Sequence, residues 1–256
     1  MNDSSQVSYA DAVAVTVSIA SAEQSDATKP ADNTSAQPLE CSVDLQSILQ
    51  TSAGHVIAFL LQLIAGNNNA IAGDTNNAVF TPDTGTSKWP VFTRRLLPHC
   101  ETHVSGGGQL SVSIELVDQL QMRQLNHQYR QRDKATNVLS FPALQECNLD
   151  EQSNEAADME LLQQIMLLTG ENTAEQNNPG AAAAELPVGD IVLCAPVVDA
   201  EARAQQKSAD AHWAHMVVHG VLHLFGFDHD NDAAANCMEA IETRVLNDLG
   251  YPAPYV

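Results

Sequence analysis

Four histidines in one short segment constrain this chain more than any other feature of its sequence. The segment HMVVHGVLHLFGFDH spans residues 215–229, and the apolar residues between its histidines predict a helix over about 209–225. His219 and His223 are four residues apart, so their imidazoles project from one face of that helix about one turn apart. Gly226 follows where a glycine can adopt the left-handed conformation that ends a helix. The segment must therefore fold as a helix followed by a tight turn.

The pattern H-x3-H-x2-G-x2-H predicts a metal site. The turn at Gly226 delivers His229 to His219 and His223. His215 lies on the same stripe, but it is roughly 12 Å from His223 along the helix axis, and zinc holds its ligands at about 2.0–2.1 Å. We therefore expect His215 to pack the helix or to support a ligand from behind. Three neutral imidazoles leave the fourth zinc position for water, as in catalytic sites. The predicted cofactor is one Zn2+, with Ni2+ and Mn2+ as alternatives.

Gly220 narrows the chemistry that such a site can perform. The metzincin proteases share this histidine spacing, but they carry a glutamate directly after the first histidine as general base. Gly220 occupies that position here. A zinc peptidase without that base would lack its proton acceptor. The sequence thus predicts the metal ligands without the protease chemistry.

Charge is distributed unevenly along the chain. Thirty-two acidic and eleven basic residues give a formal net charge of −21, which disfavours non-specific binding to nucleic acids or anionic membranes. Residues 85–142, however, carry four acids and seven bases, whereas residues 143–187 carry nine acids and no base. The positive block contains four bases within twelve residues: Arg123, Arg130, Arg132 and Lys134. A polyanionic ligand is expected to bind there.

Hydrophobic patterning predicts an α+β fold in a single compact domain, with a mixed sheet of about four strands and five or six helices. The segment 110–118 alternates apolar and polar residues as a half-buried strand does, and Asp118 is placed to cap a helix that runs to about Tyr129. The other expected strands are 41–46, 136–141 and 189–194. The other expected helices are 52–66, 88–100 with an end near Pro98, 195–207, 209–225 and 231–249.

The domain is predicted to occupy residues 39–256. Residues 1–38 are rich in Ser, Ala, Asp, Gln and Thr, and we predict a disordered tail there, although 11–20 could form a strand. Divergent insertions are expected at about 47–84 and 143–187, the second with one helical segment.

Cysteine usage and hydropathy predict a cytoplasmic protein with no membrane partner. Five cysteines without a CxxC pair suit reduced thiols in a cytoplasm. The most apolar run, residues 56–65, is about half of the ~20 residues that a membrane span needs.

Three segments of the chain resemble the bacterial YbeY family, the single-metal endoribonucleases of ribosomal RNA maturation. They are HWAHMVVHGVLHLFGFDH at 212–229, YRQRDKATNVLSFP at 129–142 and GDIVLC at 189–194, and the family carries them in the same order along the chain. The resemblance covers about residues 85–142 and 188–254. It leaves out the N-terminal tail, much of residues 47–84 and the acidic insertion at 143–187.

The resemblance implies a compact α+β domain and a set of functional residues. It implies His219, His223 and His229 as ligands of a metal, usually zinc, and Arg130 as an arginine important for activity. The implied substrate is RNA, above all the 3′ end of 16S small-subunit ribosomal RNA, with a link to ribosome quality control. The implied partners are the pre-ribosome or 30S subunit, a small-subunit ribosomal protein and the GTPase Era.

The chemistry of the basic block is consistent with RNA cleavage. A guanidinium binds phosphate oxygens bidentately and stabilises the charge that develops at phosphorus, so we expect Arg130 to bind the scissile phosphate. Arg132 and Lys134 are expected to hold flanking phosphates, and Asn137 to bond backbone or phosphate. Asp228 either orients a ligand imidazole or caps the last helix. Whether water or an RNA 2′-OH attacks stays open.

Two other functions remain compatible with the sequence. The first is a ribosome-assembly factor with a mainly structural metal, because a net charge of −21 suits docking on basic ribosomal proteins. Metal removal would unfold such a protein, whereas it would first abolish the activity of an enzyme. The second is a zinc hydrolase of another bond, such as a peptide or a small phosphoester; Gly220 argues against the peptidase.

Overall fold

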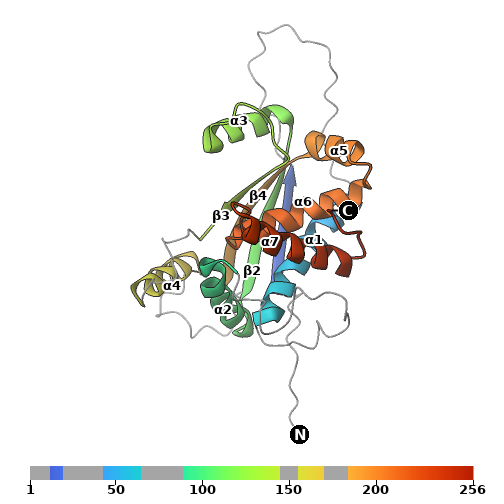
Figure 1. Ribbon diagram of the computed structural model, residues 1–256. Coiled ribbons are helices and arrows are strands. Elements are labelled where there is room, and N and C mark those ends of the chain that lie inside the picture. Colours follow the sequence, from blue (N-terminus) through green and yellow to red (C-terminus); the bar gives the residue numbers. More distant parts are fainter. Residues whose placement is uncertain (1–11, 20–42, 65–88, 145–154, 170–183, 256) are drawn as a thin grey trace.

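A computed structural model of the chain describes residues 12–19, 43–64, 89–144, 155–169 and 184–255. A four-stranded sheet in the order β1-β2-β4-β3 lies at its centre (Figure 1). The strands are β1 (Val13–Ile19), β2 (Gln109–Val117), β3 (Val138–Pro142) and β4 (Glu185–Cys194). β1 and β4 both run parallel to β2, and β3 runs antiparallel to β4. The predicted α+β class and mixed four-stranded sheet are confirmed.

The described part of the chain contains seven helices, where five or six were predicted. They are α1 (Val43–Ile64), α2 (Val91–Ser105), α3 (Gln119–Arg130), α4 (Glu155–Thr169), α5 (Ala195–Ala204), α6 (Ala209–Leu224) and α7 (Asp232–Asp248). Figure 1 shows α3 and α5 near one end of the sheet and α2 and α4 near the other. α6 lies between them, packed against α1, β3 and α7.

The alternating pattern of β2 separates the two faces of the sheet. It places four almost fully buried side chains in the main core, together with those of α1 and α6: Leu110, Val112, Ile114 and Leu116. On the opposite face, Val117 packs with Met122 of α3 in a second, smaller cluster. The predicted cap at Asp118 is confirmed, because its carboxylate accepts a 2.8 Å hydrogen bond from the backbone N–H of Gln121.

The predicted disordered tail is wrong for Val13–Ile19, which form β1. These residues pair with β2 in a continuous parallel register from Val13 opposite Leu110 to Ile19 opposite Leu116. The side-chain amide of Gln50 in α1 also donates to the carbonyl of Val15, at 3.1 Å. β1 is thus stabilised by partners far along the chain, which local composition does not reveal. Apart from the buried Ala12, the rest of the predicted tail lies outside the described residues.

The strand predicted at 41–46 is also wrong, because α1 begins at Val43. Leu49 and Ala53 are fully buried, so the helical stripe extends upstream of the apolar run at 56–65. α1 is therefore longer than the apolar run suggested, and by length and composition alone it could cross a membrane. Half of its most apolar window, however, is buried inside the molecule. This burial is typical of a core helix. The cytoplasmic location stays a prediction.

Two further boundaries differ from those predicted. α2 continues through Pro98 to Ser105, because Cys100 and Val104 extend its buried face while Pro98 itself is exposed. Burial of that face outweighs the hydrogen bond that a proline cannot make. β4 begins at Glu185, inside the segment predicted as an insertion, where pairing with β2 extends it towards its N-terminus.

Gly189 allows β3 to pass close to β4. Its φ of +150° lies in a region that other residues rarely adopt. A β-carbon there would stand 2.4 Å from the carbonyl oxygen of Phe141 and 3.0 Å from the Cα of Pro142. Both contacts are to backbone, so the neighbouring strand would have to move.

We expect Gly189→Ala to lower the free energy of unfolding by at least about 2 kcal/mol, because it adds backbone strain and a steric clash. Urea denaturation monitored by circular dichroism measures this change. Gly54→Ala in α1 is the matched control, since its β-carbon would meet no atom within 4 Å; it should be neutral or add up to about 1 kcal/mol. Equal stability of the two variants would contradict the proposed close approach.

Candidate metal centre

The C-terminal end of α6 fixes the direction in which the chain leaves the helix. Gly226 has a φ of +84°, the left-handed conformation that the sequence predicts. The N–H of Gly226 donates to the carbonyl of His223 at 3.0 Å, and the N–H of Phe227 donates to that of Leu222 at 3.1 Å. These two bonds form a Schellman motif. The chain therefore turns back along α6 instead of continuing past it.

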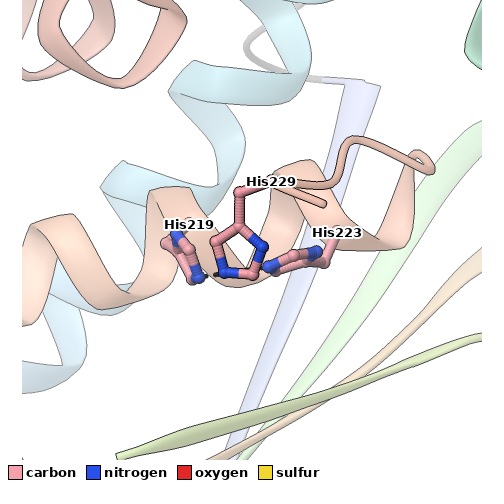
Figure 2. A group of neighbouring side chains, drawn as sticks. All are labelled: His219, His223 and His229. Atoms are coloured by element: carbon pink, nitrogen blue, oxygen red, sulfur yellow. Dashed lines mark hydrogen bonds between the residues drawn. The ribbon is translucent and has the colours of Figure 1, made fainter. Parts of the chain in front are cut away.

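The turn brings His219, His223 and His229 together; we call them the histidine triad. Each of the three histidines offers one ring nitrogen, and these nitrogens all lie within 4.8 Å of one another, as binding to a shared metal would require. The Nε2 atoms of His219 and His223 are 3.1 Å apart. In Figure 2 the ring of His229 reaches back from the turn and lies between the other two rings. The structure thus places the three predicted ligands in one cluster.

Two imidazoles of the triad are held by a carboxylate at Nδ1. Nδ1 of His219 lies 2.8 Å from a carboxylate oxygen of Glu242, and Nδ1 of His229 lies 3.0 Å from one of Asp228. An ionised carboxylate only accepts, so both Nδ1 atoms donate and both Nε2 atoms keep their lone pairs. Metal-binding histidines are typically held in this way, so the donor set suits a tetrahedral metal such as Zn2+.

Glu242 on α7 is the residue of this site that sequence reasoning missed. Its side chain is fully buried, although burial of an unpaired carboxylate is costly. Burial raises the pKa of Glu242, but hydrogen bonds from His215 and His219 outweigh that effect and lower it to about 2. The signal was present, because Glu242 shares a helical stripe with the buried Ile241 and Val245. A glutamate is almost never fully buried unless it is paired, so an acid at a core position of a helix indicates a buried partner.

His215 and Asp228 both support ligands in the structure. Nε2 of His215 lies 3.3 Å from Glu242, and its ring packs edge-on against that of His219. Asp228 accepts from the backbone N–H of His229 at 2.7 Å as well as from its ring. Asp228 does not cap the last helix, since Asn231 accepts from the first N–H groups of α7.

The basic loop, residues 130–134, begins at the last residue of α3 and is exposed along its length. The side chains of Arg130, Arg132 and Lys134 make no hydrogen bond or ion pair to any described residue, those of the triad included. Arg123 differs, because Asp133 neutralises it through two bonds of 2.6 and 2.8 Å. The three unpaired cations are therefore free to bind a ligand.

Asn137 has its side chain engaged within the protein. Its amide nitrogen donates to Glu201 at 3.0 Å, and its amide oxygen accepts from the backbone N–H of Val138 at 2.8 Å. Glu201 also contacts the buried ring of His212, at 3.1 Å. These bonds connect β3 with α5 and α6, so they give Asn137 a structural role. Its contact with a substrate stays a prediction.

Gly220 lies on the face of α6 that packs against the sheet. A β-carbon there would approach Ile191 of β4 at 3.2 Å and the hydroxyl of Ser140 of β3 at 3.3 Å. That hydroxyl donates to the carbonyl of Gly220 at 3.0 Å. Even a β-carbon at this position would be tight against these two side chains, so the packing leaves little room for the glutamate that metzincins carry there.

Comparison with known proteins identifies relatives for most of the described domain. The model of the family described as Endoribonuclease YbeY matches residues 77–250. Endoribonuclease YbeY of Stutzerimonas stutzeri is 43% identical over 148 residues, which are 58% of this chain and 72% of that protein. The same-named protein of Chromobacterium violaceum is 43% identical over 148 residues, 57% and 68% of the two chains.

A solved structure gives a weaker similarity. It is the solution structure of a Thermotoga maritima protein that is 20% identical in sequence, with a TM-score of 0.30. The match covers 65% of this chain and 87% of that protein. A score this low does not establish a shared fold.

The pKa of His223 predicts how the metal-free protein responds to acid. Burial, followed by the neighbouring His219, lowers its pKa from 6.5 to about 4. As the pH falls from 6.5 towards 4, the unfolded chain binds a proton that the folded state cannot, so the free energy of unfolding decreases. The loss from Glu242 begins lower, because its ordinary pKa is 4.5.

We expect His223→Asn to remove part of the stability loss between about pH 7 and pH 5. Urea unfolding of the metal-free protein at the two pH values measures it. His127→Asn, which replaces an exposed histidine of α3, is the control and should keep the wild-type pH dependence. An identical pH dependence in wild type and His223→Asn would contradict the prediction.

Proposed function

This chain belongs to the YbeY family of endoribonucleases, and on that basis we propose that it is a metal-dependent endoribonuclease that cleaves single-stranded RNA. The observation that carries the proposal is the convergence of His219, His223 and His229, with the rings of His219 and His229 each held by a carboxylate. A site of three imidazoles leaves a coordination position for a reactant.

The histidine triad would hold the metal through Nε2 of His219 and of His229 and a ring nitrogen of His223. When bound, Zn2+ or a similar ion supplies Lewis-acid chemistry: it polarises a phosphoryl oxygen and acidifies water. Glu242 and Asp228 keep the Nδ1 protons of their histidines in place, so the lone pairs stay directed at the centre of the triad.

The basic loop would bind the RNA backbone. Arg130 presents a bidentate donor for the scissile phosphate, and Arg132 and Lys134 supply charges for the flanking ones. Tyr129, whose ring is half exposed, packs edge-on against Phe141 at a centroid distance of 4.9 Å. Proteins that bind single-stranded nucleic acids combine unpaired cations with such aromatic rings, on which bases stack. This binding mode does not depend on whether water or an RNA 2′-OH is the attacking group.

The family resemblance supports 16S ribosomal RNA as the substrate, with processing of its 3′ end and ribosome quality control as the role. The partners proposed on the same ground are the pre-ribosome or 30S subunit, a small-subunit ribosomal protein and the GTPase Era. A net charge of −21 favours contact with basic ribosomal proteins next to the RNA. Such a role would place the protein in the cytoplasm.

Metal removal tests the catalytic role. Purified protein stripped with a chelator should lose cleavage of a 3′-extended 16S RNA fragment and regain it with Zn2+, while it stays folded by circular dichroism. His223→Ala should show no recovery, because one ligand is missing; this variant also excludes a contaminating nuclease. Unfolding on stripping would favour the docking factor with a structural metal. Absence of cleavage by folded, zinc-loaded protein would contradict the proposed activity.

Replacement of Arg130 tests the phosphate contact. We expect Arg130→Ala to lower the cleavage rate by about 100-fold or more, because a donor to the developing charge is lost, while Zn2+ affinity is unchanged. The matched control is Arg203→Ala in α5, which removes another exposed arginine. Single-turnover kinetics on the same RNA fragment measure both variants. Equal rates for Arg130→Ala and wild type would rule out the assigned role.

A further inference from the structure

The carboxylate of Glu242 accepts hydrogen bonds from three donors, two on α6 and one in the C-terminal segment. One oxygen accepts from Nδ1 of His219 at 2.8 Å. The other accepts from Nε2 of His215, at 3.3 Å, and from the hydroxyl of Tyr255. Its own side chain is fully buried. The C-terminal segment is thereby connected, through α7, to a member of the histidine triad.

The identity of these donors bears on what the carboxylate does. No lysine or arginine in the described part of the chain pairs with Glu242; its donors are two imidazoles and a phenol. A buried carboxylate is weak support for stability in general, because its desolvation offsets what its bonds contribute. Its geometric effect is specific, since an acceptor at Nδ1 of His219 keeps the proton there and the lone pair on Nε2.

We propose that Glu242 is a positioning residue that sets the tautomer and orientation of His219 for metal binding, and that Tyr255 holds Glu242 in that position. This inference rests on the proposed metal centre. Asp228 makes the corresponding bond to His229, but its side chain is 53% exposed, whereas that of Glu242 is 0% exposed. Water competes for the bond between Asp228 and His229 but not for the bond between Glu242 and His219. Glu242 therefore contributes more to metal affinity than Asp228.

Glu242→Gln is the informative substitution because it conserves shape. The amide has one acceptor and one donor end, while the carboxylate faces donors on both oxygens. Either His219 or the pair His215 and Tyr255 must then lose its acceptor. We expect Zn2+ affinity to fall by about 10- to 100-fold, and the visible absorption bands of bound Co2+ to shift. Asp228→Asn should lose less.

The experiment titrates Zn2+ into the full-length, metal-free protein against a chromophoric chelator and records Co2+ spectra of the same variants. Glu239→Gln is the matched control: it lies one turn earlier on α7 and makes no hydrogen bond to a histidine in the described residues. Its affinity and spectrum should equal those of wild type. A purely structural role of Glu242 would lower the urea midpoint of the metal-free protein and leave both readouts unchanged.

The outcomes separate the two proposals. If wild type binds neither ion at the triad, so that His223→Ala titrates identically, the metal centre itself fails. If His223→Ala loses binding and Glu242→Gln binds as wild type does, the role of Glu242 is overturned. Should Glu242→Gln not fold, Tyr255→Phe decides, because it removes one donor and keeps the charge. We expect a several-fold loss of affinity for Tyr255→Phe, and an unchanged value would overturn the proposal.

Discussion

The turn that ends α6 is the constraint on which the whole site depends. A left-handed residue at Gly226 reverses the chain, and the bond from Phe227 to Leu222 fixes the angle of that reversal. Phe225 and Phe227 are almost fully buried, so the core anchors the turn on both sides of the glycine. His229 reaches its partners because of this geometry. The third member of the cluster is thus set by the backbone and by apolar packing, before any metal contributes.

The polar groups behind the triad show that stability and function make different demands. The core beneath α6 would lose no packing if Glu242 were an apolar residue of similar size, and such replacements are often neutral or stabilising. What an apolar side chain cannot do is hold a proton on Nδ1 of His219. We therefore attribute the buried acid to orientation of the imidazole and not to its contribution to folding.

Sequence predicted what local interactions determine. The helix at 209–225, the turn at Gly226 and the cap at Asp118 all depend on residues within a few positions of one another, and all are present. The pattern of 11–20 allowed a strand, but β1 was assigned to a disordered tail because its stability depends on pairing with β2, far along the chain. The burial of Glu242 could be read from α7, but its role was missed because it depends on α7 crossing α6, which no spacing within either helix encodes. Tertiary contacts were the missing information in both cases.

The charge of this chain also favours one form of RNA. Electrostatic forces between exposed groups are screened over about 8 Å at physiological salt, so the unpaired cations at Arg130, Arg132 and Lys134 dominate their own surroundings despite a net charge of −21. A flexible single strand can bring a few phosphates to that loop and leave the rest in solvent. A rigid duplex presents two dense rows of phosphate, which a net charge of −21 repels more strongly. The acidity of the chain is therefore compatible with the proposed binding of single-stranded RNA.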